Sequence, residues 1–135
     1  MAHQHIVYMM LAEAAAQLAD VTALRRYAAQ LEKLAVRDDH RPYLAIANRA
    51  WGIACRLDSQ FVDAGDRLQK ALALFEQMEA HWQIGCTLYE IAQLNLAQAN
   101  PAGAMEHFSR AQAEFEELGA LPDIQRTKAA LEVIV

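Results

Sequence analysis

The sequence predicts an all-helical protein, and two observations carry this prediction. Of the 135 residues, 55% are apolar while glycine (5) and proline (3) are scarce, a composition that favours helices because few residues interrupt them. Apolar positions also repeat along the whole chain, aligning in rows that begin at positions 1, 41, 81 and 121, which is typical of stacked helical hairpins. We therefore expect a right-handed αα-superhelix of three helical hairpins followed by a capping helix.

The repeat is visible in the first three of these rows because the aligned positions are apolar in each of them. The aligned sets are Leu11, Trp51 and Ile91; Leu24, Ala64 and Ala104; Ala28, Leu68 and Phe108; Leu31, Ala71 and Ala111; and Ala35, Phe75 and Phe115. The rows define one domain over residues 1–135, with repeats at about 1–40, 41–80 and 81–120 and a capping helix at 121–135.

Helix-start signals recur in phase with the repeat. They are Asp20 before Val21, Asp58-Ser59 before Phe61, and Asn100 before Pro101, where a side-chain oxygen can accept from the first free amides and proline suits the first helical turn. The matching stop signals are Asp38-Asp39 before Pro42, Glu79-Ala80, and Gly119 before Pro122. The predicted helices cover residues 3–19, 21–37, 42–57, 60–79, 81–98, 101–118 and 122–133.

The connections between these helices are short, so consecutive helices must run antiparallel and form hairpins. In each row the first helix is named helix A and the second helix B. The first row begins inside a helix A without a preceding cap, and residues 121–135 occupy the phase of a fourth helix A. We expect the chain to be a fragment of a larger protein in which the last helix covers the third repeat.

A second pattern lies inside the helices B, where a small residue, a large one and a small one follow at fixed spacing. The sets are Ala64, Leu68, Ala71 and Ala104, Phe108, Ala111, and they accompany the large-small pairs Trp51-Gly52 and Ile91-Ala92 in the helices A. Small residues allow the two helices to approach closely, and large ones fill the remaining space.

This pattern resembles the tetratricopeptide repeat over the whole chain, although the unit here is longer than the one usual in that family. The tyrosine usual in helix A is replaced by Ala15, Cys55 and Asn95. The longer unit is similar to the C-terminal repeats of large bacterial ATPase-containing regulators and adenylate cyclase-like proteins. HEAT-type repeats, whose range of unit lengths includes the one found here, are the alternative.

Charge and cysteine content restrict the partners and the compartment. A net charge of -5 and a pI near 5.5 do not suit a nucleic-acid partner, which normally meets a basic face. No segment reaches the roughly 20 apolar residues of a membrane span. Cys55 and Cys86 stand in apolar helical patterns without a CxxC partner, which predicts reduced, buried thiols and a cytoplasmic location.

The residue constellations of common catalytic sites do not occur. There is no Gly-rich phosphate motif, and neither Ser59 nor Ser109 lies in a GxSxG turn. His40, His81 and His107 lack a glutamate three residues earlier. His3 and His5 lie on different faces of a helix end that we expect to fray. We expect no enzymatic activity, no cofactor and no metal. The acidic run Glu114, Glu116 and Glu117 is interpreted as a solvated helix face.

The resemblance implies that a partner binds the concave wall formed by the helices A. Carried over to this sequence, the positions that flank the large-small pairs are Met9, Glu13 and Ala16, then Arg49, Ile53 and Arg56, then Tyr89, Gln93 and Leu96. Independently of the family, the spacing of three or four residues places each trio on one helix face.

Arg49 and Arg56, with Tyr89, are the most specific candidates, because arginine suits carboxylates and both residue types are common in binding hot spots. The alternative is that the two arginines only form ion pairs with Glu13 or Glu90. The expected function is that of a protein-protein interaction or regulatory scaffold module of a bacterial protein, which binds a protein, a peptide or a neighbouring domain. Self-association, giving a homodimer, is the alternative function.

Overall fold

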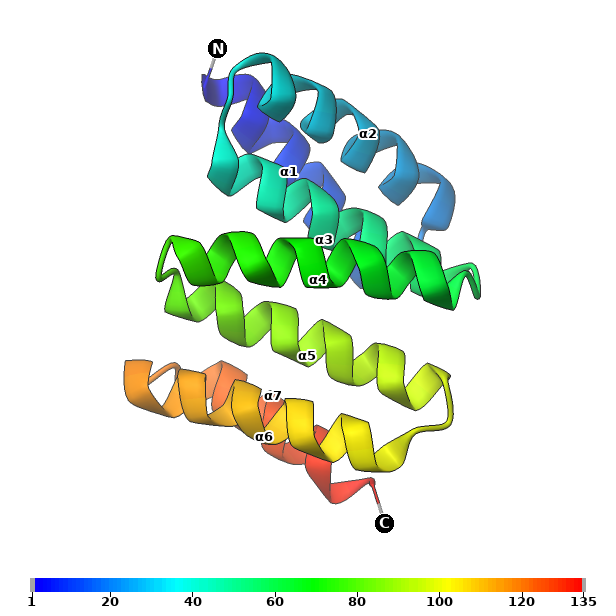
Figure 1. Ribbon diagram of the computed structural model, residues 1–135, viewed down its shortest axis with the longest axis vertical. Helices are drawn as coiled ribbons and strands as arrows, with labels where there is room; N and C mark the ends of the chain where they lie inside the picture. The colour runs from blue at the N-terminus through cyan, green and yellow to red at the C-terminus, as the bar shows by residue number, and fades with distance from the viewer. Residues whose placement is uncertain (1, 135) are drawn as a thin grey trace. The chain divides into compact units, whose positions relative to one another are not determined.

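The computed structural model describes the backbone of residues 2–134 and the side chains of residues 4–134, and this part of the chain forms helices and no strands (Figure 1). The helices are α1 (Ala2–Gln17), α2 (Val21–Arg37), α3 (Arg41–Leu57), α4 (Phe61–Gln77), α5 (His81–Ala97), α6 (Pro101–Leu118) and α7 (Leu121–Glu132). The all-helical prediction is confirmed, and the predicted helix ends lie within two residues of the observed ones. Within the described residues, no helix has both the length and the apolar content to span a membrane.

The connections between these helices share one backbone conformation, which explains why helices begin at the evenly spaced positions 21, 41, 61, 81, 101 and 121. Each connection contains one residue with positive φ, between 50° and 65°, at positions 19, 39, 59, 79, 99 and 119. The next residue donates its N–H back to the helix just ended, as in Asp20 to the Ala15 carbonyl (2.9 Å) and Ala120 to the Phe115 carbonyl (3.0 Å). This is the Schellman end of a helix. Only Gly119 could be recognised from its residue type.

All three predicted helix starts are confirmed, since α2 begins at Val21, α4 at Phe61 and α6 at Pro101. Asp20 accepts a hydrogen bond from the Ala23 amide (3.2 Å), and Asn100 accepts one from the Gly103 amide (3.1 Å). At the start of α4 the position is as predicted, but the two polar residues before it have another place: Asp58 caps the C-terminal end of α3 and Ser59 takes the left-handed conformation of the connection. The sequence signal is ambiguous there, since polar residues mark both ends of a short connection.

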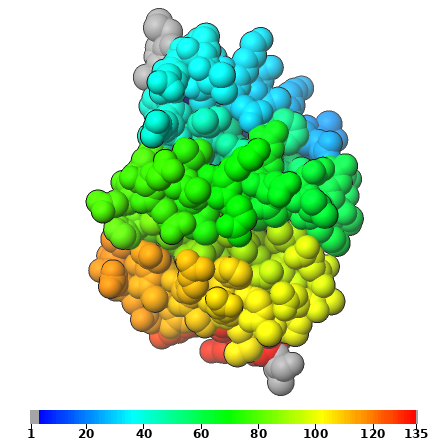
Figure 2. Space-filling model, in the orientation of Figure 1, coloured from blue at the N-terminus to red at the C-terminus, as the bar shows by residue number. Residues whose placement is uncertain are grey.

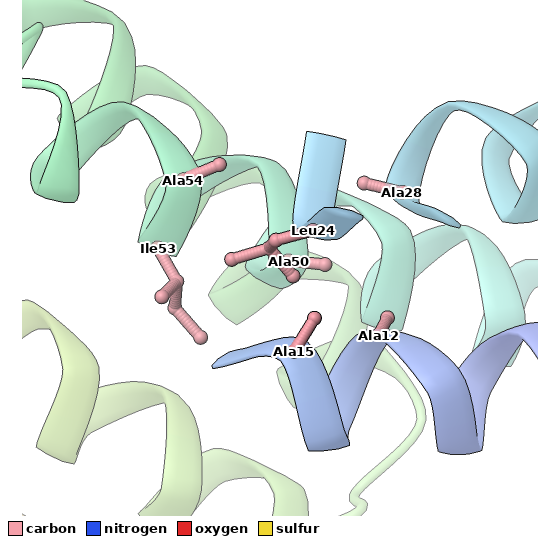
Figure 3. Close-up of a cluster of buried hydrophobic side chains, with 7 residues drawn as sticks. All are labelled: Ala12, Ala15, Leu24, Ala28, Ala50, Ile53 and Ala54. Atoms are coloured by element: carbon pink, nitrogen blue, oxygen red, sulfur yellow. The ribbon is translucent and has the colours of Figure 1, made fainter. Parts of the chain in front are cut away.

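The chain divides into two compact units, Met1–Leu74 (unit 1) and Phe75–Val135 (unit 2), with the boundary inside α4. In unit 1, small residues let α1, α2 and α3 approach closely around the buried Leu24. Figure 3 shows this cluster, which consists of Ala12, Ala15, Leu24, Ala28, Ala50, Ile53 and Ala54. At the contact of α3 with α4, a Cβ on Gly52 would lie 2.5 Å from the Leu68 side chain. Glycine is therefore required at this crossing.

In unit 2, α6 packs against both α5 and α7, and its side chains cover most of the face of unit 2 seen in Figure 2 (yellow to orange). Phe108 and Ala104 of α6 form the core with Ala92 of α5, and all three are fully buried. Leu131 and Ile134 from the end of the chain pack onto this core. The small-large-small spacing of α6 thus faces inward, as the sequence pattern predicts.

Candidate protein-binding surfaces

Three of the predicted binding residues come together in unit 1. Glu13 of α1 and Arg49 and Ile53 of α3 line one small pocket of about 40 Å³, with Ala16 also in its wall. Arg49 and Ile53 are only 7% and 9% exposed, whereas Glu13 is exposed. The pocket therefore combines one carboxylate and one guanidinium with an apolar lining. Its volume is too small for a drug-sized ligand, which needs about 300 Å³ or more.

The remaining predicted residues of unit 1 lie outside this pocket. Met9 of α1 and Arg56 of α3 are half-buried and are not among its lining residues. Arg56 follows Arg49 at a distance of two helical turns along α3. The two arginines differ in burial, so substitutions at them should differ in effect. A substitution at the buried Arg49 disturbs packing, whereas the half-buried Arg56 can be replaced with less effect on the core.

In unit 2, Tyr89 is held between an aromatic and a cationic neighbour. Its ring packs edge-on against Phe108, with centroids 5.0 Å apart and an interplanar angle of 70°. The guanidinium carbon of Arg126, from α7, lies 4.2 Å from the centre of the Tyr89 ring. This distance is well inside the range of about 6 Å for a cation-π interaction. Tyr89 is therefore fixed in position by α6 and α7.

The contact extends to a second aromatic residue through Asp123. The Trp82 indole nitrogen donates a hydrogen bond to the Asp123 carboxylate (2.9 Å), and the same carboxylate pairs with Arg126 at 3.3 Å. Trp82 is 44% exposed and the Arg126 side chain 47% exposed. We call Trp82, Tyr89, Asp123 and Arg126 the aromatic-arginine cluster. It joins α5 to α7 and presents an indole and a guanidinium to solvent.

Of the four members of this cluster, only Tyr89 is among the binding residues predicted from the sequence. A signal for Trp82 was present, since it precedes Tyr89 by two helical turns and so shares its helix face. Gln93 and Leu96, one and two turns after Tyr89, continue the same face; Gln93 is half-buried and Leu96 is 37% exposed. Asp123 and Arg126 belong to α7, which occupies the phase of a helix A but was interpreted only as a cap.

The histidines do not suggest a metal centre. Within the described residues, no three His, Cys, Asp or Glu side chains converge in a way that could hold a metal ion. His5, expected at a frayed helix end, is instead 2% exposed and stacks on Tyr43 with ring centroids 4.9 Å apart. His3 lies outside the residues whose side chains are described. The Asp38 carboxylate, 3.3 Å from His5 Nε2, has its pKa lowered to about 2, mainly by a hydrogen bond from Arg37.

These features define an all-helical protein in which aromatic and arginine side chains of α3, α5 and α7 lie at or near the surface. Comparisons with protein-family models, with curated proteins and with solved structures gave no match. The function is therefore inferred from the residues and their geometry.

Proposed function

We propose that this chain is a non-catalytic protein-interaction module built from repeats similar to the tetratricopeptide repeat, and that it binds a peptide or a neighbouring domain on its helix A faces. The aromatic-arginine cluster carries the proposal. Tryptophan, tyrosine and arginine are the residues most enriched in binding hot spots, and Trp82 and Arg126 remain exposed although both are already oriented by Asp123. Pre-oriented side chains lose less entropy when a partner binds.

The repeat assignment is supported by the packing of the helices B. Ala64, Leu68 and Ala71 of α4 and Ala104, Phe108 and Ala111 of α6 are all fully buried. Gly52 meets Leu68 so closely that a Cβ has no room. Close helix approach through small residues is the feature that distinguishes the resemblance from a HEAT-type array, and it favours the tetratricopeptide-like interpretation.

The proposal is tested with peptides selected from a random library on the wild-type protein. Arg126→Glu should weaken the selected peptides at least tenfold, because it removes the cation over Tyr89 and places a carboxylate beside Asp123; tenfold corresponds to about 1.4 kcal/mol. Arg110→Glu, which makes the same charge change at an exposed position of α6, serves as the control. Binding is measured by fluorescence anisotropy, and circular dichroism checks the fold.

Equal affinities of the Arg126→Glu and Arg110→Glu variants would rule out the cluster as the binding surface. The wall predicted in unit 1 is tested in the same assay by Arg56→Glu, because the burial of Arg49 would mix a folding defect into any result at that position. A peptide lost by Arg56→Glu but retained by Arg126→Glu would place the binding surface in unit 1.

A second candidate function, self-association, is favoured by one observation on α1. Ile6, Val7, Met10 and Leu11 are 37% to 61% exposed and form one apolar helix face. In the repeat, Val7 aligns with Ala47 of α3 and Thr127 of α7, which are both fully buried, within helices that pack against α2 and α6 respectively. The positions that align with Val7 in α3 and α7 are thus buried, whereas Val7 itself is 51% exposed.

A dimer joined through two copies of the α1 face would bury these side chains. Sedimentation should then show a dimer at high micromolar concentration, and Met10→Glu should return the protein to a monomer because a charge at the centre of an apolar contact loses its hydration. Val62→Glu, on α4 at a position 78% exposed, is the matched control. A wild-type protein that stays monomeric throughout contradicts this function.

A further inference from the structure

Unit 1 contains a cleft that neither proposed function uses. It has a volume of about 320 Å³ and lies between α2, α3 and α4. Trp51 and Cys55 of α3 line it together with Arg25 of α2, and polar residues of α4 complete its wall. None of the predicted helix A binding residues lines it. The volume falls at the lower end of the range found for small-molecule sites, about 300 to 1,000 Å³.

Two of the residues that line this cleft have a buried hydrogen-bond donor without an acceptor among the described residues. The donors are the indole Nε1–H of Trp51 and the guanidinium Nε–H of Arg25. An unsatisfied buried donor costs about 1 to 3 kcal/mol, so most buried donors in native proteins have a partner. Two such donors on residues that line the same cleft are suited to a ligand that brings acceptor oxygens.

The two arginines of the cleft are held in place by hydrogen bonds and ion pairs. The Arg25 guanidinium donates to Asp58 (2.7 Å) and to Gln60 (2.9 Å), which leaves its Nε–H as the unsatisfied donor. Arg67 is paired with Glu32, and its guanidinium carbon lies 5.3 Å from the centre of the Trp51 indole. Both guanidinium groups are therefore oriented before a ligand arrives, which lowers the entropy lost on binding.

The α4 side of the cleft adds carboxylates. Asp63 and Asp66 are exposed, lie about one turn apart on α4 and line the same cleft. They would repel a dianion such as a phosphate or a dicarboxylate, and they would attract a cationic group carried by the ligand. Since Lys70 adds a third cation to the two arginines of the lining, charge complementarity favours a ligand with one acidic and one basic group.

Cys55 does not add covalent chemistry to the cleft. Cys55 is 7% exposed, and burial raises the pKa of its thiol above the ordinary value. A thiol with a raised pKa is a poor nucleophile because the thiolate is the reactive form. We therefore treat the cleft as a site for noncovalent binding, in which Cys55 is only part of the lining.

We propose that this cleft binds a small zwitterion of the amino-acid class. The ligand carboxylate accepts hydrogen bonds from Trp51 Nε1–H and Arg25 Nε–H, and its ammonium group pairs with Asp63 and Asp66. This site is independent of the helix A faces, so it adds a small-ligand function to the interaction module. It can succeed or fail without affecting the proposals made for α1 and for the aromatic-arginine cluster.

The experiment follows the two indole N–H signals of ¹⁵N-labelled protein by nuclear magnetic resonance. The chain has two tryptophans, and Trp82→Phe assigns their signals. L-Leucine is the probe, L-leucinamide lacks its carboxylate, and 4-methylpentanoate lacks its ammonium group. L-Leucine at up to about 10 mM, well above a millimolar Kd, should move the Trp51 indole signal downfield in a saturable way. The Trp82 signal, from an indole bound to Asp123, should stay in place.

The two analogues should produce shifts that saturate at concentrations at least tenfold higher or not at all. Trp51→Phe keeps an aromatic ring under Arg67 but removes the donor, and it should weaken L-leucine at least tenfold by calorimetry, since a hydrogen bond to a charged group contributes about 1.5 to 3 kcal/mol. Asp63→Asn combined with Asp66→Asn should weaken it as well, whereas Glu117→Gln in unit 2 should not.

An unmoved Trp51 signal with L-leucine overturns the proposal, and so does an equal response to either analogue. These arms use the wild-type protein, so they decide the matter even if Trp51→Phe fails to fold.

Discussion

Replacing Phe108 by alanine should lower the free energy of unfolding by about 3 to 5 kcal/mol, the usual effect of removing a fully buried aromatic side chain. The Phe108 ring is completely buried at the centre of unit 2, where α5, α6 and α7 meet around it. Its loss leaves a cavity and removes the edge-on contact with Tyr89. At about 2 to 8 °C per kcal/mol for domains in this size range, the thermal midpoint should fall by at least about 6 °C.

Met105→Ala is the matched control, because Met105 belongs to the same helix but is 49% exposed. Surface substitutions of this kind change stability by about 0.5 kcal/mol or less. Urea unfolding followed by circular dichroism measures both variants. Similar midpoints for the two would mean that the α6 pattern does not face the core. Because Phe108 supports Tyr89, the Phe108→Ala variant should also weaken peptides that need the aromatic-arginine cluster.

The helical content and the helix phase could be predicted from the sequence because they depend on local, repeated signals. Asp20 and Asn100 cap helices where the sequence predicts it, because their side-chain oxygens accept hydrogen bonds from amides less than one turn away. The buried columns of α4 and α6 follow from the repeat for the same reason. Leu68 and Phe108, aligned in that repeat, are both fully buried.

The C-terminal ends of the helices were harder to predict from the sequence, because only one of the left-handed residues in the connections is a glycine. Ala19, Asp39, Ser59, Glu79 and Ala99 adopt a conformation that costs about 1 to 2 kcal/mol for an L-residue. These residue types do not by themselves predict a left-handed conformation. The packed helices on both sides impose it, and sequence signals cannot report a conformation that tertiary packing imposes.

The candidate sites depended even more on tertiary structure. The helix face of Arg49 could be read from the spacing, but its burial to 7% depends on what packs over that face. The cleft brings together Arg25, Trp51 and Arg67 from three helices. What it can bind depends on which guanidinium nitrogen atoms are already hydrogen-bonded to neighbouring side chains. The repeat predicts which apolar positions are buried. The polar residues between them do not recur with the repeat, so their arrangement cannot be predicted in this way.

Replacing Gly85 by alanine should destabilise the protein by about 1 to 3 kcal/mol, the range for overpacking a well-filled core. On helix propensity alone the change would stabilise α5 by about 1 kcal/mol. Steric contact decides the sign, because a Cβ at this position would lie 2.6 Å from Cε1 and 2.9 Å from Cζ of Phe115. Phe115 is fully buried in α6, and interiors packed at the usual density leave little room for a ring to move.

The double variant Gly85→Ala, Phe115→Leu separates this steric conflict from any other effect at Gly85. Phe115→Leu alone should destabilise the protein, because it leaves part of the ring volume empty. Combined with Gly85→Ala, the new methyl group occupies some of that volume, so the loss in the double variant should be smaller than the sum of the two single losses by at least about 0.5 kcal/mol, the size of coupling expected for residues in contact. Chemical denaturation of the four proteins gives this coupling energy. Strictly additive losses would show that the close approach of α5 to α6 is not what requires glycine at position 85.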